Sequence, residues 1–139
     1  MDDMELIYAY TTKQAVEDGM LVLIAAVTSK EAGITFPVYL SQAVWSKYVQ
    51  IPEMMKGEQD ESGRLWDILW MFRNAARKVS GSCLEFKFIC RLPDIGDWES
   101  NEKLFENRFQ RMVTLKSICQ AQDFDDPSPA IFILKPNED

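Results

Sequence analysis

The strongest periodic signal in this sequence is a helical one over residues 62–79. Apolar side chains recur there at intervals of three and four, as on a helix that packs one face onto a core. The stripe consists of Leu65, Ile68, Leu69, Phe72, Ala75, Ala76 and Val79. Asp60, Glu61 and Ser62 offer N-terminal caps, and Ser80-Gly81 ends the pattern. We therefore expect one long amphipathic helix in the middle of the chain.

The last third of the chain carries three segments that predict strands. In residues 83–90, Leu84, Phe86 and Phe88 fall on one face and Glu85 and Lys87 on the other, which is the pattern of a half-buried strand. Residues 111–119 alternate less cleanly, and residues 130–134 form a short apolar run between two prolines. Antiparallel pairing joins such neighbours with the simplest connections. The acidic segment 93–110 is expected to form a piece of helix or a flap over this sheet.

The chain begins with signals for a short helix followed by an extended segment. Thr11 or Thr12 can cap a helix over residues 13–18, and Gly19 can end it. Residues 20–26 are mostly apolar and too few for a long helix. They predict a strand or a buried extended segment.

Two further helix signals precede the long helix. Thr28 and Glu31 have the spacing of a capping box. Pro37 is tolerated in a first helical turn and Pro52 ends a helix, so a helix is expected over residues 38–49. Together these elements predict a single α+β domain over residues 1–139. Several N-terminal helices would pack on a C-terminal three-stranded antiparallel sheet.

The amino-acid composition excludes several classes of function but says little about the fold. The 139 residues are 47% hydrophobic and 27% charged, which is ordinary for a globular domain. There is no histidine, which excludes Ser-His-Asp and Cys-His catalysis and zinc sites that need an imidazole. Cys83, Cys90 and Cys119 form no C-x-x-C motif and indicate no disulfide framework. We expect no catalytic residue, no metal and no cofactor.

No part of the sequence indicates a membrane or secretory segment. The longest apolar stretch is far shorter than the roughly 20 residues that a membrane-spanning helix needs. The first residues are acidic, whereas a secretory signal begins with basic ones. These observations predict a cytoplasmic protein that does not contact a membrane.

The charge of the chain is acidic overall and basic only in its middle. The formal net charge is -7, which argues against broad binding to a phosphate backbone. Residues 64–91 nevertheless hold a local basic region next to Trp66 and Trp70, whose rings can stack on bases. A small nucleic-acid-binding factor therefore stays an alternative. The basic side chains of this region are Arg73, Arg77, Lys78, Lys87 and Arg91.

Four side chains of the predicted long helix fall together beside its apolar stripe. At about 100° per residue, Trp66, Trp70, Arg73 and Arg77 share one side of the helix. In one interpretation, both tryptophans pack under the sheet or against residues 38–49, and the arginines are solvated. In the other, the four residues bind a partner, because Trp and Arg are enriched at interface hot spots.

The start of this helix also carries a group of charged residues that has two interpretations. Asp60, Glu61, Arg64 and Asp67 could act as an acid–base or magnesium cluster. However, Asp60 and Glu61 lie where capping acids belong, and Arg64 and Asp67 have the spacing of a helix-surface ion pair. We interpret Asp60, Arg64 and Asp67 as structural. Asp60 or Arg64 is also placed to hold the preceding loop onto the fold.

Residues 59–71, with the sequence QDESGRLWDILWM, resemble the signature of an uncharacterised family of small proteins. Its members are carried on bacterial plasmids, phages and integrative elements. The segment 95–109 departs from the family, because it is longer and more acidic, so no role is carried over to it. Further matching pieces are Tyr10-Thr11, residues 14–19, 36–38, 43–45 and 113–116, and an apolar strand before an acidic tail.

The resemblance implies an intracellular accessory protein of a mobile element, and it implies no reaction. With the missing histidine and the acidic charge, it predicts a non-enzymatic protein that acts by binding an unidentified protein partner. One version is inhibition of a host defence system, in which an acidic surface occupies a nucleic-acid site.

Overall fold

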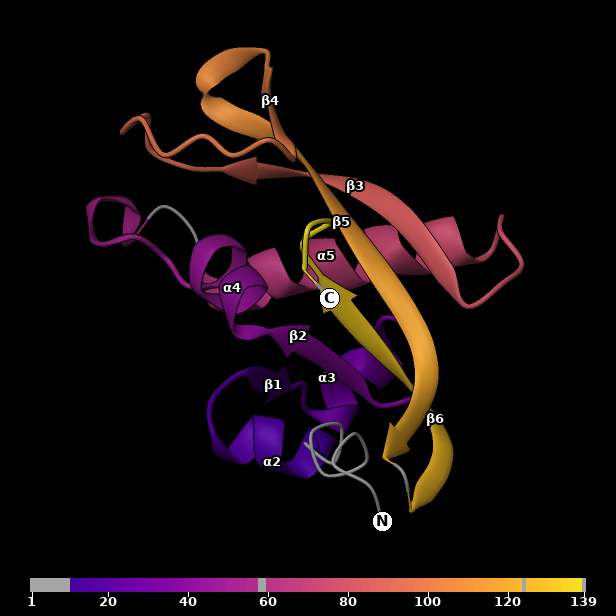
Figure 1. The fold of residues 1–139 in the computed structure, drawn as a ribbon. Coiled ribbons are helices and arrows are strands. Elements are labelled where there is room, and N and C mark those ends of the chain that lie inside the picture. Colours follow the sequence, from indigo (N-terminus) through magenta and orange to yellow (C-terminus); the bar gives the residue numbers. More distant parts are fainter. Residues whose placement is uncertain (1–10, 58–59, 124, 139) are drawn as a thin grey trace.

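The computed structural model describes residues 11–57, 60–123 and 125–138. Its centre is a six-stranded sheet in the order β1-β2-β6-β5-β3, with β4 also paired to β5 (Figure 1). The strands are β1 (Leu21–Leu23), β2 (Val38–Ser41), β3 (Cys83–Arg91), β4 (Glu102–Phe105), β5 (Asn107–Asp123) and β6 (Asp126–Leu134). The helices are α2 (Thr12–Glu17), α3 (Ala26–Glu31), α4 (Gln42–Val44) and α5 (Glu61–Ala76), with a π-helical turn η1 (Trp45–Val49) and a 3-10 turn η2 (Glu53–Met55).

The prediction of a three-stranded antiparallel sheet under several N-terminal helices is wrong. One sheet holds six strands, and the helices of the first half are short and alternate with strands. The three predicted strands are still neighbours, in the antiparallel order β3-β5-β6. The first half of the chain extends this sheet by β1 and β2, and β2 pairs in parallel with β6. The fold is therefore α+β and dominated by one mixed sheet.

Two expectations for the first half fail for identifiable reasons. Only the second part of residues 38–49 is helical, because Val38–Ser41 form β2. All four of these strand residues are buried. They therefore lack the alternation of apolar and polar side chains that would have distinguished a strand from a helix. The expected cap at Thr28 is also wrong, since α3 begins earlier, with Ala25 at its N-cap. The short first helix is confirmed as α2.

The long amphipathic helix is confirmed as α5, although it ends at Ala76, so Val79 of the predicted stripe lies beyond it and is exposed. Asp60 is its N-cap, and the carboxylate accepts a hydrogen bond from the backbone N–H of Gly63 at 2.6 Å. Ile68 and Leu69 of the predicted stripe are fully buried. Phe72 meets Phe86 of β3 edge to face, with ring centroids 5.8 Å apart. This packing fixes α5 across one face of the sheet, behind β5 and β3 in Figure 1.

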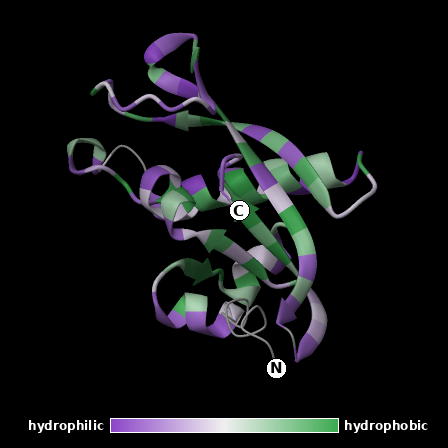
Figure 2. Ribbon diagram, in the orientation of Figure 1, coloured by the Kyte–Doolittle hydropathy of each residue, from purple (hydrophilic) through white to green (hydrophobic). Residues whose placement is uncertain are grey.

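The opposite face of the sheet is covered over only half of its width. At the β2-β6 end, Tyr39 stacks on Phe132 with centroids 5.2 Å apart, and Val16 of α2 packs against this pair. At the β3-β5 end the face is open, and Glu85 and Lys87 point to solvent. Figure 2 shows the resulting alternation of hydrophobic and hydrophilic residues along β5. The α5 side of the sheet holds the main core, which includes Leu40, Ile68, Leu69, Phe88, Val113, Leu115 and Ile133.

Candidate functional site

The structure rules out burial of Trp66 and Trp70 beneath the sheet. Their side chains are 37% and 40% exposed on the outer side of α5. The two rings stack 5.7 Å apart with an angle of 14° between their planes. The guanidinium carbon of Arg73 lies 5.5 Å from the centroid of the Trp70 ring. With Arg77, which is exposed at the C-cap, these residues form a surface that we call the tryptophan face.

Arg73 is held in place by the turn that follows α3. Gly33 in this turn has a φ of +85°, and a Cβ added there would lie 2.2 Å from Nε of Arg73. Glycine is thus needed both for the left-handed backbone and for the passage of the guanidinium. The turn fixes the cation beside Trp70, so the tryptophan face is ordered before any partner arrives.

Gly33→Ala is therefore expected to destabilise the protein more than Gly19→Ala. Gly19 has a similar φ of +78°, so both alanines carry a similar backbone strain of about 1 kcal/mol or more. Nothing lies within 4 Å of a Cβ at Gly19, whereas at Gly33 the new Cβ meets Arg73. Urea unfolding of the two variants measures the difference. Equal losses would show that Arg73 does not pack on this turn.

The three residues interpreted as structural have separate positions. Asp60 caps α5, and Asp67 lies at the surface. Arg64 is only 4% exposed, so its interpretation as half of a helix-surface pair is wrong. Its guanidinium donates to the carbonyl oxygen of Gln50 at 2.9 Å and to that of Arg91. Arg64 thus joins the segment after η1 to the end of β3.

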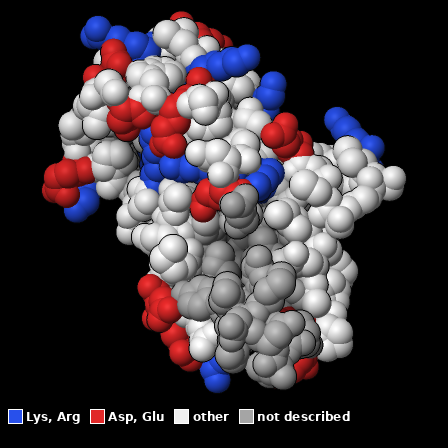
Figure 3. All heavy atoms as spheres, viewed as in Figure 1, with Lys and Arg blue, Asp and Glu red and all other residues white. Residues whose placement is uncertain are grey.

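The basic region predicted over residues 64–91 is divided by the fold. Arg64 is buried, and Arg73 and Arg77 belong to the helix side of the sheet. Lys87 of β3 points to the opposite, open face. On the side shown in Figure 3, Lys and Arg side chains also lie beside Asp and Glu instead of gathering in one basic area. This division speaks against a continuous phosphate-binding surface.

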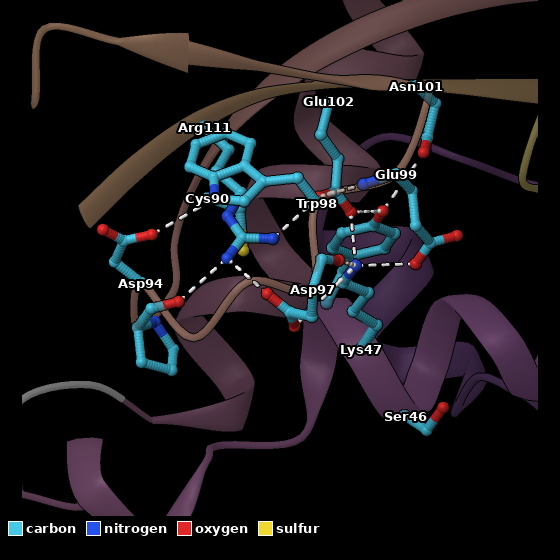
Figure 4. A network of polar contacts seen from close by, with 12 residues as sticks. Ser46, Lys47, Cys90, Asp94, Asp97, Trp98, Glu99, Asn101, Glu102 and Arg111 are labelled. Atoms are coloured by element: carbon cyan, nitrogen blue, oxygen red, sulfur yellow. Dashed lines mark hydrogen bonds and ion pairs between the residues drawn. The ribbon is translucent and has the colours of Figure 1, made fainter. Parts of the chain in front are cut away.

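A second cluster of charged residues lies at the end of the main core (Figure 4). Arg111 of β5 is fully buried. It donates to Oε1 of Glu102 at 2.7 Å, to Oδ1 of Asp97 at 2.6 Å and to the carbonyl oxygen of Pro93 at 2.8 Å. The ring of Trp98 covers the guanidinium at 4.1 Å from its centroid. Arg111 thus anchors the segment between β3 and β4.

Lys47 of η1 holds the other side of this cluster. Its Nζ lies 2.8 Å from Oε2 of Glu102 and 2.6 Å from Oε2 of Glu99. Lys135 reaches Glu99 at 2.9 Å, and the Tyr48 hydroxyl donates to Glu102. Three carboxylates therefore face three cations. We call this group the ionic cluster, and its members are Lys47, Tyr48, Asp97, Glu99, Glu102, Arg111 and Lys135.

The ionic cluster fits a structural role better than a chemical one. Burial alone would raise the pKa of Glu102, but hydrogen bonds from Lys47, Tyr48 and Arg111 outweigh it and hold the pKa below its ordinary value. Burial and the neighbouring Glu102 raise the pKa of Tyr48. Glu102 is thus ionised and Tyr48 protonated near neutral pH, so neither is poised for acid–base catalysis there.

The pKa directions predict that the protein loses stability in acid. Hydrogen bonds and charges from the three cations outweigh burial and hold the pKa values of Asp97 and Glu99 below ordinary, as for Glu102. A depressed folded-state pKa stabilises the protein above the unfolded value, and this stability is lost as pH falls through both. We expect the free energy of unfolding to decrease as the pH drops below about 4.5. Urea titrations between pH 7 and 3 measure this, and a smaller slope in Glu102→Gln would assign it to the cluster.

No family model, no curated protein and no solved structure matches this chain. The resemblance of residues 59–71 to proteins of mobile elements therefore stays a prediction. Within residues 11–57, 60–123 and 125–138, no group of three Cys, Asp or Glu side chains is arranged to hold a metal ion. No helix in the same part of the chain is long and apolar enough to cross a membrane.

Proposed function

We propose that this chain acts by binding another protein through the tryptophan face. The observation that carries this proposal is the exposed, stacked row of Trp66, Trp70 and Arg73. Trp and Arg account for a large share of the energy at protein interfaces, because an indole offers a wide and rigid contact area and a guanidinium offers several hydrogen-bond donors in one plane. Here the row is already ordered by stacking and by the turn at Gly33. A partner could bury it at a small cost in side-chain entropy.

The charges at the Trp70 end of the row define the chemistry of the partner, whereas Asp60 and Asp67 lie beside Trp66 at the other end. Arg73 and Arg77 lie at the C-terminal end of α5, where their positive charge also interacts favourably with the helix dipole. A complementary segment places an apolar side chain over the two indoles and a carboxylate beside the arginines. We therefore infer a protein partner that presents an acidic and apolar segment to α5.

The resemblance over residues 59–71 supports a wider proposal about biological context. Trp66 and Trp70 both lie within that motif, so the segment that carries the resemblance also carries the exposed row. On this basis we propose an accessory protein of a bacterial mobile element that binds its target inside the cell without catalysing a reaction. A component of a host defence system is one target of this kind.

Nucleic acid is the alternative ligand for the same side chains. Indole rings stack on bases, and arginines bind phosphates. The net charge of -7 and the division of the basic residues between two faces of the sheet favour protein over nucleic acid. Salt dependence separates the two ligands, since phosphate contacts weaken steeply as salt rises.

A displayed library of random peptides tests the proposed surface directly. We expect enrichment of peptides that combine acidic and apolar residues, and Trp66→Ala/Trp70→Ala should weaken their binding by about 30-fold or more. Phe109→Ala, at a site that is 41% exposed on β5, is the matched control and should bind as the wild type does. Circular dichroism and urea unfolding confirm that each variant is folded.

Two results would contradict the proposed function. The first is selected peptides that bind the tryptophan variant and the wild type equally well. The second is strong binding of a single-stranded oligonucleotide that weakens with salt and is lost in the tryptophan variant, which would support nucleic-acid binding instead.

A further inference from the structure

β3 forms an edge of the sheet, and in the described part of the chain β5 is the one strand that pairs with it. The backbone N–H of Leu92 donates to Phe109, and the carbonyl of Ser82 accepts from Cys119. These bonds show that even-numbered residues of this stretch bond to β5. In an antiparallel pair the bonding alternates, so the odd-numbered residues direct N–H and C=O groups away from β5. The outward set is Cys83, Glu85, Lys87, Ile89 and Arg91.

This edge lacks two of the features that prevent strands from pairing, a bulge and a proline, although it does carry charged side chains. It runs over nine residues, Cys83–Arg91, in one register with β5 and without a bulge. It contains neither proline nor glycine. The carbonyl of Arg91 accepts a hydrogen bond from Arg64, which caps one end. The backbone from 83 to 89 is left as a template for another strand.

The side chains along this template complement themselves. Glu85 and Lys87 are both exposed and carry opposite charges on neighbouring outward positions. In an antiparallel pair of two such strands centred on Phe86, Glu85 of each copy lies opposite Lys87 of the other, and Cys83 lies opposite Ile89. Centring on Lys87 instead would place two lysines opposite each other, which is unfavourable. Charge therefore favours the register centred on Phe86 over those centred on Glu85 or Lys87.

The helix beneath the edge supplies an apolar contact at the same place. Met71 follows Arg64 by seven residues, about two helical turns, so both side chains lie on the same side of α5. Unlike the buried Arg64, Met71 is 40% exposed. Arg64 reaches the end of β3, and Phe72 contacts Phe86. Met71 thus lies near the centre of the template. A second copy related by a two-fold axis through Phe86 would bring the two Met71 side chains toward each other.

We propose that two copies of this chain form a dimer by antiparallel pairing of their β3 strands about Phe86. The sheet then continues from one copy into the next. The tryptophan face takes no part in this dimer interface. Its Arg73 lies against the turn at Gly33, so the face is on the α3 side of α5. A dimer would present two copies of that face to a partner, and this inference does not depend on the proposed function.

Charge reversal tests both the interface and its register. Sedimentation equilibrium of the wild-type chain is expected to show a dimer. Lys87→Glu or Glu85→Lys alone places like charges opposite each other and should weaken the dimer at least about tenfold. The double variant Glu85→Lys/Lys87→Glu restores opposite pairs and should recover the dimer. Lys103→Glu on β4 is the control, because it changes the same charge on the same face of the sheet, on the other side of β5 from the β3 edge.

A covalent probe reads the register independently. In Ile89→Cys, the new thiol should lie opposite Cys83 of the second copy, within the range of Cα separations that a disulfide spans. Mild oxidation should then give a covalent dimer much faster than in Lys103→Cys. A monomer at all concentrations would overturn the proposal, and so would a dimer that the single charge reversals do not weaken. Peptide binding by the tryptophan face is measured on the same Lys87→Glu variant, so the two proposals can fail separately.

Discussion

Glu102→Ala is expected to lower the free energy of unfolding by about 3–5 kcal/mol. Glu102 has a fully buried side chain and accepts from the equally buried Arg111 at 2.7 Å. Its second oxygen lies 2.8 Å from Nζ of Lys47 and accepts from Tyr48. Removing the carboxylate leaves a buried guanidinium and a buried hydroxyl without this partner, and the loss of a partner costs more than the pair itself contributes. Urea unfolding followed by tryptophan fluorescence measures the change.

Glu99→Ala is the matched control for this prediction. Glu99 carries the same charge in the same ionic cluster and also contacts Lys47, but its side chain is 35% exposed. Water can replace it, so the loss should stay near 1 kcal/mol or below. Similar losses for Glu99→Ala and Glu102→Ala would show that the cluster is solvated and does not anchor the segment before β4.

Leu69→Asp is expected to unfold the protein or to destabilise it by more than about 4 kcal/mol. Leu69 is fully buried in the main core on the sheet side of α5. A carboxylate at this position must either lose its hydration or expel α5 from the sheet. The melting temperature and far-UV circular dichroism report the outcome.

An aspartate on the same helix at an exposed site separates burial from helix propensity. Met71→Asp introduces the same residue two positions later, where the side chain is 40% exposed. In the Lys87→Glu background, where the proposed dimer is weakened, we expect a loss of about 1 kcal/mol or less there. If Leu69→Asp left the melting temperature unchanged, α5 would pack on the sheet by another face.

Helices and strands with one buried and one solvated face could be predicted from the spacing of their apolar residues. A strand that is buried on both faces could not. The stripe of α5 and the alternation of β3 each contrast a buried face with a solvated one, so their patterns reported the burial correctly. Val38–Ser41 of β2 are buried on both faces, so nothing in their order separated strand from helix. The error in the strand number follows in part from this, because β2 connects β1 to the rest of the sheet. The expectation of a helix or flap over residues 93–110 was also wrong, since β4 and the start of β5 lie there.

The tryptophan face and the ionic cluster also differ in how far they could be predicted from the sequence. Helical spacing alone brought Trp66, Trp70 and Arg73 together, but only the packing of α5 decided that they face outward. The ionic cluster needs residues from η1, β4, β5 and the chain end, and no local pattern connects these segments. One sequence signal was present but not used. Arg111 is in phase with Val113 and Leu115, which places a charge on the apolar side of the strand, where it requires a partner.

The measurement that tests the tryptophan face most directly is site-specific photocrosslinking in a lysate of the cells that naturally make this chain. A photoreactive phenylalanine replaces Trp66 in one variant and Phe109, which is 41% exposed, in the other. The proposed function predicts a discrete protein adduct from position 66 that survives nuclease treatment and is absent from position 109. Equal labelling from both positions, or an adduct at position 66 that nuclease removes, would contradict it.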